Sequence, residues 1–386
     1  MTTPRSRVRR FIVAVVVLDL LAVMGAYAAS VWVRGVPTLE YLQNPDRRTQ
    51  SAGLFRADPM LGYVPVPGAS GAFLFPGGGV VPIKFDAQGF RVPVAAADRS
   101  ADRPAVLTLG CSYAFGDAVP AEETFTWRLG DRLGGPAINA GVSGYGLAQM
   151  LVLAERLVPV YRPRILLVEY AGWLVERALS ETAPSAFGDI PTPYFTDANG
   201  EWRVAPPVFE TAVFSAPFFA FSDRSGAAPP GRRTFFTRAA MPYFAWTDAH
   251  RLGVTVRKWR GRVPPPSGDR LGAIRHAYRR LAEIAAAASA SMVVVALAGS
   301  PASPTPEIIA ALTASPGTTV VDAEAYLARQ PDGTAAMSPQ AYRERYAVWA
   351  GTPPKMVDPH PNALANALIA DAILASIDAS RLTPHE

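Results

Sequence analysis

Residues 107–116 read Leu-Thr-Leu-Gly-Cys-Ser-Tyr-Ala-Phe-Gly. The apolar run from Ala105 to Leu109 ends at Gly110, and Ser112 follows just before a segment with helical character. Such a run predicts a buried strand. The serine then lies at the carboxyl end of that strand, where open α/β sheets bind ligands and carry out chemistry. The stretch therefore predicts an α/β fold with a candidate nucleophile at the edge of its sheet.

The alternation of strand and helix continues along the rest of the chain. Four further apolar or β-branched runs predict strands, at residues 137–140, 165–170, 292–298 and 318–321. Helical periodicity is found at residues 122–133, 147–157, 269–288, 306–314 and 362–377. Strands that alternate with helices form parallel sheets with helices on both faces, and their carboxyl ends share one edge. We expect residues 105–386 to form a three-layer α/β/α sandwich around a roughly five-stranded parallel sheet.

A base for Ser112 is available near the C-terminus, where Asp358 and His360 flank a proline. A serine hydroxyl needs an adjacent base to become a nucleophile, and a carboxylate that orients the imidazole completes a triad. Taken singly, Ser112 is also explained as a turn residue that caps the next helix. The Asp-His segment is likewise explained as a capped entry into the last helix. Their occurrence together, in this order, favours a Ser-His-Asp site; the other histidines, His250, His276 and His385, are interpreted as bystanders.

These segments, with Asn139-Ala140-Gly141-Val142-Ser143-Gly144 between them, resemble the SGNH/GDSL hydrolase superfamily. Members carry four blocks: a G-D-S nucleophile, a glycine, an asparagine within G-x-N-D, and a late Asp-His pair. The chain matches three of the four, from about Asp58 to its end, with cysteine in place of the first aspartate. The resemblance implies an acyl-enzyme mechanism with Ser112, His360 and Asp358 as the catalytic residues. It also implies that the backbone N–H groups of Ser112 and Gly141 bind the oxyanion.

The missing block is the asparagine after the strand at residues 165–170. Alignment on Gly172-Trp173 places Leu174 at its position, whereas alignment on strand length places Gly172 there, and neither side chain donates a hydrogen bond. Losing one such donor typically costs about 100–1000-fold in turnover. The indole N–H of Trp173 and the amide of Asn139 are candidate replacements. Asn139 is interpreted first as a residue that fixes the loop after the second strand.

Cys111 is the only cysteine, so an intramolecular disulfide is impossible. We interpret it as a small, half-buried residue beside Ser112. A nucleophilic Cys111 paired with His360 is the alternative. Neither a zinc-ligand spacing nor a phosphate-binding loop is found in the sequence, so no metal or cofactor is expected.

The first 33 residues have the pattern of a membrane segment. Four arginines precede the run from Phe11 to Val33, whose one charge is Asp19. The run is long enough to span a bilayer, and the arginines should remain cytoplasmic, which sends the rest of the chain outward. We expect a single-pass anchor in a bacterial inner membrane with the catalytic domain in the periplasm or outside. The alternatives are a signal peptide cleaved after Ala28, which would give a secreted protein, and a buried helix of a cytosolic protein.

The positive net charge has the same origin. Without residues 1–33 the chain loses four arginines and one aspartate, and its formal net charge falls from +5 to +2. A balance so close to neutral does not indicate a nucleic-acid partner.

Two further segments flank or interrupt the expected domain. Residues 34–104 predict a connector followed by short extended pieces, including a strand at 80–85 that should pack on the main domain. Residues 175–268 form a long insertion with 15 of the 38 aromatic residues. So many aromatics predict either a subdomain with its own core or a lid that contacts an acyl or glycan substrate or the membrane surface.

Together these patterns predict an exported, membrane-anchored SGNH-type serine esterase or O-acyltransferase. The resemblance points to acyl esters, such as acetylated cell-envelope glycans, as substrates. The alternative is a catalytically impaired SGNH scaffold that serves as a binding or assembly component of an envelope polysaccharide system; the missing asparagine favours it, and the intact Ser112, His360 and Asp358 weigh against it.

Overall fold

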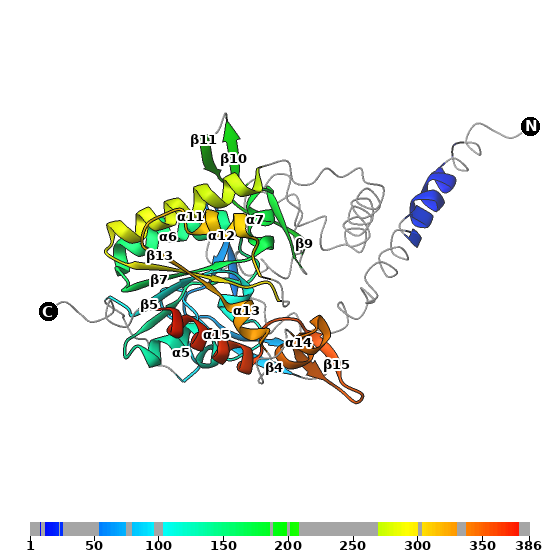
Figure 1. Cartoon of the computed structure of the whole chain (residues 1–386). Helices are drawn as coiled ribbons and strands as arrows, with labels where there is room; N and C mark the ends of the chain where they lie inside the picture. Colours follow the sequence, from blue (N-terminus) through cyan, green and yellow to red (C-terminus); the bar gives the residue numbers. More distant parts are fainter. Residues whose placement is uncertain are drawn as a thin grey trace, which may run out of the picture.

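The computed structural model describes residues 8, 12–22, 24–25, 54–74, 79–95, 103–185, 188–198, 201–207, 269–299, 303–329 and 337–377. At its centre is a five-stranded sheet with the strand order β13-β12-β7-β5-β6 (Figure 1). The strands are β5 (Val106–Leu109), β6 (Ala137–Asn139), β7 (Ile165–Tyr170), β12 (Ser291–Ala296) and β13 (Thr318–Asp322). Every pairing between them is parallel. The expected five-stranded parallel sheet is thus confirmed.

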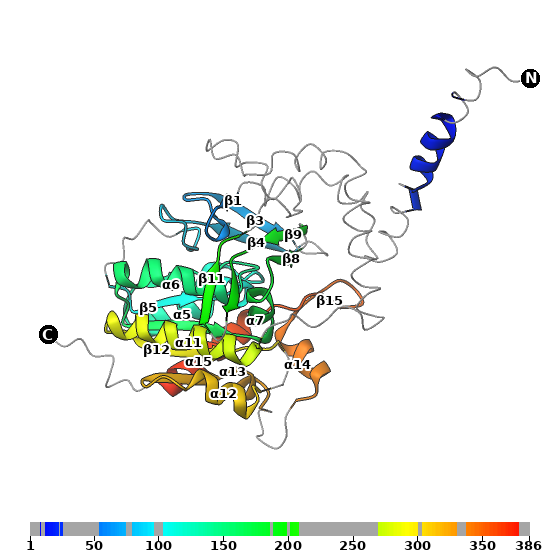
Figure 2. The same ribbon diagram turned by 90° about the horizontal axis from the view of Figure 1, so that it is seen from above.

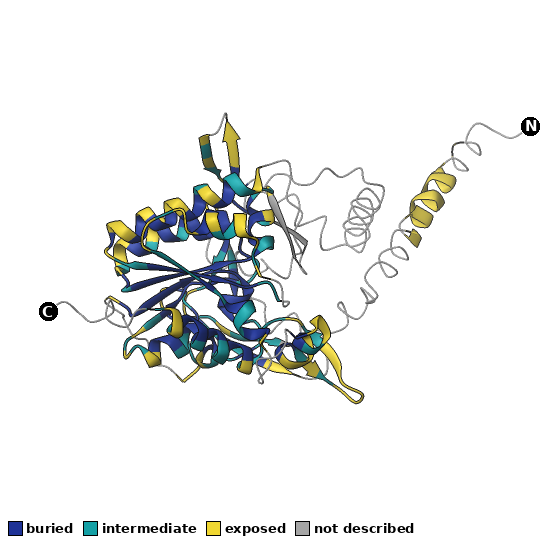
Figure 3. Cartoon of the chain, in the orientation of Figure 1, coloured by how far each residue is buried: buried dark blue, intermediate teal, exposed yellow. Residues whose placement is uncertain are grey.

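Helices cover both faces of this sheet, as the α/β/α prediction requires. On one face lie α6 (Leu147–Tyr161), α11 (Arg270–Ala287) and α12 (Pro306–Leu312); on the other lie α5 (Phe125–Arg132), α13 (Ala323–Leu327) and α15 (Ala363–Ser376) (Figure 1). Successive strand residues point to opposite faces. Leu107 and Leu166 therefore join the first core, whereas Val106 and Ile165 join the second. The central strands are buried throughout, and the outer face of α11 is exposed (Figure 3).

The strand order places a switch point beside β5. From β5 the chain first crosses to β6 at one edge, then returns to β7 on the other side of β5 and continues outward to β12 and β13. Loops that leave β5 and β7 at their carboxyl ends diverge at such a point and leave a crevice in which α/β proteins bind ligands. The segment that contains Ser112 begins there, directly after β5.

The lead-in forms two antiparallel hairpins that pack on the sandwich (Figure 2). They consist of β1 (Phe55–Asp58) with β2 (Gly62–Pro65), and β3 (Ser70–Leu74) with β4 (Val80–Lys84). Their buried side chains share a third core with Phe115 and Tyr145 of the main domain. The Tyr145 hydroxyl donates to the carbonyl oxygen of Tyr63 at 2.5 Å. The strand expected at residues 80–85 forms as β4 and ends at Lys84, and its Val81 and Ile83 side chains belong to this third core.

The described part of the expected insertion consists of a short helix and two hairpins. These are α7 (Gly172–Ala178), β8 (Thr182–Ser185) with β9 (Gly188–Pro191), and β10 (Tyr194–Ala198) with β11 (Glu201–Ala205). Residues 208–268, which hold the aromatic residues from Phe209 to Trp259, lie outside the described residues. A separate subdomain and a lid both remain predictions.

Several short elements complete the fold, and of these only α4 (Ser112–Phe115), in the segment of helical character at Ser112, was expected from the sequence. The others are α14 (Pro339–Tyr346) and the hairpin of β14 (Val348–Ala350) and β15 (Lys355–Asp358). All are eight residues or shorter, which is too short for a hydrophobic period to be recognised. Ser112 begins α4 and Asp358 ends β15, whereas His360 follows in the loop before α15.

The expected membrane segment, residues 11–33, lies partly outside the described residues. Residues 12–22 are helical, and their apolar side chains are exposed. Within the described part of the chain, no helix is both long enough and apolar enough to cross a membrane. His250 and His385 also fall outside the described residues.

Candidate active site

Ser112 is presented by a sharp turn between β5 and α4. This turn requires glycine at position 110. A Cβ atom there would clash with its neighbours, because it would lie 2.4 Å from Glu169 Oε2 and 2.5 Å from the Ala114 Cβ. Ser112 is the first residue of the four-residue helix α4. Within the described ranges, its backbone N–H has no hydrogen-bond acceptor. An unengaged amide at a helix start is suited to bind an oxyanion.

A buried carboxylate holds the beginning of α4. Glu169, on β7, accepts the backbone N–H groups of Cys111 at 2.8 Å and Ala114 at 3.2 Å. Burial raises the pKa of Glu169, although these hydrogen bonds oppose the effect. Sequence reasoning missed this residue, yet a signal was present: it is the single charged residue in the otherwise apolar run from Ile165 to Tyr170.

Cys111 is fully buried, so the prediction of a half-buried residue is wrong. Its thiol donates to Glu169 Oε1 at 2.9 Å and accepts the indole N–H of Trp173 at 3.3 Å. Burial and the charge of Glu169 raise the pKa of Cys111 to about 12. Since the thiolate is the reactive form, this environment keeps Cys111 inert and disfavours its interpretation as the nucleophile.

Asp358 and His360 form a close pair between β15 and α15. Asp358 Oδ1 lies 2.6 Å from His360 Nδ1 and also accepts the backbone N–H of His360 at 2.7 Å. A proton on Nδ1 is therefore held by Asp358, which leaves Nε2 free to act as a base. The imidazole ring contacts the Tyr113 ring edge-to-face, with 5.3 Å between ring centroids. The structure thus places the predicted base next to α4.

Several charges control the protonation of His360. Burial lowers its pKa, but the hydrogen bond with Asp358 and the negative charges of Asp117, Asp358 and Glu169 outweigh burial and leave the pKa above its ordinary value. Among the described residues, the Ser112 hydroxyl has no hydrogen bond to His360; it lies 3.7 Å from Cys111 Sγ. In proteins without bound substrate such catalytic hydrogen bonds are often long and tighten only in the complex.

The two predicted oxyanion donors differ in their hydrogen bonding. The Ser112 N–H has no acceptor among the described residues, whereas the Gly141 N–H donates to Asn139 Oδ1 at 3.1 Å. Asn139 Nδ2 in turn donates to the carbonyl oxygen of Ala114 at 2.8 Å, which agrees with the interpretation that Asn139 fixes this loop. Gly141 acts as an oxyanion donor only if it exchanges its partner for the substrate, so its role stays a prediction.

None of the residues proposed for the asparagine position offers a free donor. Gly172 begins α7 and has no side chain, and Leu174 is fully buried. The Trp173 indole N–H is engaged by Cys111, and its ring packs on Tyr113 with 5.2 Å between ring centroids. The third oxyanion donor of the resembling family therefore has no replacement at these three positions in this structure.

A buried arginine from the lead-in holds the other end of α4. Arg91 is 1% exposed, and its guanidinium donates to the carbonyl oxygens of Phe115, Gly116 and Val119. It also lies over the Phe115 ring, 4.5 Å from the centroid. A cation at a helix C-terminus satisfies its free carbonyls and opposes its dipole. Through Arg91, the lead-in therefore helps to hold α4, the helix that carries Ser112.

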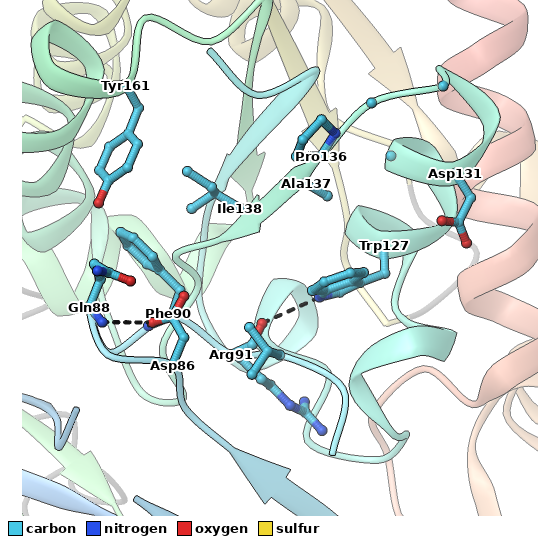
Figure 4. Close-up of a pocket in the computed structure, with 14 residues that line it drawn as sticks. Asp86, Gln88, Phe90, Arg91, Trp127, Asp131, Pro136, Ala137, Ile138 and Tyr161 are labelled. Atoms are coloured by element: carbon cyan, nitrogen blue, oxygen red, sulfur yellow. Dashed lines mark hydrogen bonds between the residues drawn. The ribbon is translucent and has the colours of Figure 1, made fainter. Parts of the chain in front are cut away.

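A cavity of about 430 Å³ opens elsewhere on the domain, around the start of β6 (Figure 4). Phe90, Trp127, Ile138 and Tyr161 contribute to its walls, and none of the proposed catalytic residues lines it. His276, on α11, packs against Phe195 of β10 and Trp202 of β11, and it takes no part in the candidate site. Across the described residues, no group of three or more His, Cys, Asp or Glu side chains is arranged to hold a metal ion.

Solved structures with similar folds include hydrolases. LAE5, an α/β hydrolase enzyme from the metagenome of Lake Arreo, is 12% identical, with 74% of this chain and 99% of that chain covered and a TM-score of 0.37. A G-D-S-L family protein from Desulfitobacterium hafniense is 11% identical, with 72% and 98% covered and a TM-score of 0.33. The psychrotrophic esterase EstA from Pseudoalteromonas sp. is 13% identical, with 70% and 94% covered and a TM-score of 0.29.

No protein-family model matches the chain, and no curated protein matches it. At identities this low, the chemistry has to be judged from the residues of the site itself.

Proposed function

We propose that the chain is an SGNH-type serine esterase or O-acyltransferase. The observation that carries the proposal is the Asp358–His360 pair, joined at 2.6 Å through Nδ1, whose imidazole contacts Tyr113 of α4, the helix that begins at Ser112. This combination supplies a base with a fixed tautomer against the helix whose first residue bears the hydroxyl. The shared motifs of the SGNH superfamily support the same chemistry.

The proposed reaction proceeds through an acyl-enzyme. Ser112 Oγ attacks the ester carbonyl carbon while its proton passes to His360 Nε2, and the carbonyl electron pair moves onto the oxygen. The Ser112 N–H binds this oxyanion, and Asp358 stabilises the imidazolium. The imidazolium then gives its proton to the departing alkoxide oxygen as the ester bond breaks. Water completes a hydrolase cycle, and a second alcohol completes an acyltransferase cycle.

We further propose where the protein is located in the cell and which class of substrate it uses. The apolar run at residues 11–33 and the arginines before it support export and anchoring in an inner membrane. For an exported enzyme of this type, acyl esters on cell-envelope glycans are the proposed substrates. The resemblance to the superfamily is what supports that class.

A second candidate function is a binding or assembly component built on an impaired scaffold. Two observations favour it: the third oxyanion donor is missing, and the Gly141 N–H is already engaged by Asn139. One remaining backbone donor stabilises an oxyanion less than three do. The two candidates differ in a measurable quantity, namely turnover that depends on Ser112.

The deciding experiment uses the full-length chain purified in a mild detergent. Hydrolysis of p-nitrophenyl acetate and butyrate is compared between the wild type, Ser112→Ala and His360→Ala. His276→Ala is the matched control, because that histidine packs against Trp202 and lies outside the site. The enzyme proposal predicts that turnover is lost in the first two variants and retained in the control. Equal rates in all four proteins would reject it and favour the binding function.

A further inference from the structure

Asp117 joins three parts of the candidate site. Its backbone N–H donates to the carbonyl oxygen of Ser112 at 3.1 Å, just beyond the end of α4. Its Oδ2 accepts the hydroxyl of Ser143, from the loop after β6, at 2.8 Å. The same oxygen lies 3.9 Å from His360 Nε2. No motif singled out this residue, although it directly follows the stretch of residues 107–116 that contains the serine.

The imidazole of His360 consequently has a carboxylate near each ring nitrogen. Asp358 is bonded to Nδ1, and Asp117 faces Nε2. Among the described residues, the Glu169 carboxyl group of β7 also acts on its charge, and the Tyr113 ring of α4 packs against it. These groups are negative or neutral, so the surroundings favour the positively charged form of the ring.

The Asp117 side chain is well placed to act through its charge. It is 14% exposed, and its Oδ1 is buried without a hydrogen-bond partner among the described residues. Burial raises its pKa, whereas His360, the Ser143 hydrogen bond and Arg91 lower it. A separation of 3.9 Å from Nε2 is too long for a hydrogen bond. The proton on Nε2 therefore stays free for the oxygen of the departing alcohol.

We propose that Asp117 is a positioning residue of the acyl-transfer reaction. Its carboxylate stabilises the imidazolium of His360 from the Nε2 side, opposite Asp358, and Ser143 holds that carboxylate in place. The proposal rests on the proposed esterase or acyltransferase function. In the step concerned, the Ser112 proton moves to Nε2 as the Oγ–C bond forms, and it leaves with the alkoxide as the ester C–O bond breaks. Asp117 exchanges no proton in either step.

The position of the acid limb of kcat/KM tests this role, because that limb reports the protonation of the free base. Full-length wild type, Asp117→Asn and Ser143→Ala are assayed with p-nitrophenyl acetate between about pH 5 and about pH 9. Removing the charge should move the limb of Asp117→Asn downward by about 0.5–1 pH unit and lower plateau kcat/KM about 3- to 10-fold. Ser143→Ala keeps the carboxylate, so its limb should stay at or above the wild-type position.

If Asp117 had a purely structural role, Asp117→Asn would lower the melting temperature and leave the acid limb of kcat/KM at its wild-type position. Coincident limbs in Asp117→Asn and wild type therefore overturn the proposal. If Asp117→Asn fails to fold, Asp117→Ser also removes the charge while retaining a hydroxyl for Ser143, and the same downward shift is required of it. Failure of the underlying function has a different signature, since Ser112→Ala would then retain wild-type turnover.

Discussion

At the scale of single residues, the chemistry depends on one imidazole whose protonation is set by its neighbours. Asp358 fixes the Nδ1 proton at 2.6 Å, and Asp117 adds negative charge 3.9 Å from Nε2. Burial alone would lower the pKa of His360, so the raised value shows that the carboxylates dominate. The cost of a more basic imidazole is that a larger fraction is protonated, and thus inactive as a base, near neutral pH.

This balance predicts the pH dependence of the enzyme. The neutral form of His360 is required to accept the Ser112 proton, so kcat/KM should rise with pH through a midpoint above about 6.5, the ordinary value for histidine. The same interactions stabilise the fold at low pH; that contribution is complete below about 6.5 and is lost as pH rises through the raised pKa. A pH–rate profile of the full-length chain checks the first effect, and a limb centred below 6 would contradict it.

At the scale of elements, α4 is too short to be stable by itself. An isolated helix needs about 12–15 residues to be even marginally stable in water, and α4 has four. It is held from outside at both ends: Glu169 accepts amides at its beginning, and Arg91 donates to carbonyls at its end. The position of the nucleophile therefore depends on β7 and on the lead-in.

The first anchor can be tested with Glu169→Leu. Leucine removes Oε2, the oxygen that accepts both the Cys111 and the Ala114 N–H groups, and each buried amide left without a partner costs about 1–3 kcal/mol. We expect a lower melting temperature. We also expect kcat, normalised to fluorophosphonate-titrated sites, to fall at least about tenfold with KM little changed, because about 1.4 kcal/mol at the transition state is a factor of ten. Unchanged kcat per titrated site would show that Glu169 serves stability alone.

The second anchor can be tested with Arg91→Met, which retains much of the side-chain volume. The carbonyl groups of Phe115 and Val119 would lose the donor that Arg91 supplies, whereas that of Gly116 also accepts the Val119 N–H. Each buried polar group left unpaired costs about 1–3 kcal/mol. The free energy of unfolding should therefore fall by at least about 2 kcal/mol, as measured by urea denaturation. Arg132→Met is the control, because Arg132 forms a solvent-exposed ion pair with Asp371, and such pairs contribute about 0–1 kcal/mol. Similar losses in both variants would refute the anchoring role of Arg91.

The long, periodic elements were predictable from the sequence, whereas the contacts that organise the site were not. The strand at residues 165–170 forms as predicted. The helix expected from residue 122 begins at Phe125, because residues 121–123 form a 3-10 turn and Thr124 caps the helix. Glu169 reaches Cys111 across 58 residues, and such a contact is set by sheet packing, which no local pattern encodes. For the same reason the sequence did not reveal that the Gly141 N–H donates a hydrogen bond to Asn139.

At the scale of the whole molecule, the switch point of the sheet brings distant segments together. Ser112 follows β5, whereas His360 comes from the loop that leads into α15, the last described helix. The hairpins of the lead-in pack beside the same region through Phe115 and Tyr145. A site assembled in this way requires the domain from the lead-in to α15 to fold as a unit.

The N-terminal run yields a prediction for the intact protein in a bacterial cell. If it anchors the chain, the full-length protein should sediment with inner membranes and resist carbonate extraction, and external protease should digest it in spheroplasts. Mass spectrometry of the N-terminus distinguishes the two export routes, since cleavage after Ala28 would remove the anchor. Recovery of the intact chain in the cytoplasmic fraction would contradict export.

The most direct test of the central claim is covalent labelling of the full-length chain with a fluorophosphonate probe, followed by peptide mass spectrometry. The phosphonyl group should be found on Ser112, with the fluoride displaced by its hydroxyl oxygen. Labelling should disappear in Ser112→Ala and fall sharply in His360→Ala, while His276→Ala labels as the wild type does. Absence of any adduct on Ser112, under conditions in which a known serine esterase is fully labelled, would contradict the assignment of Ser112 as the nucleophile.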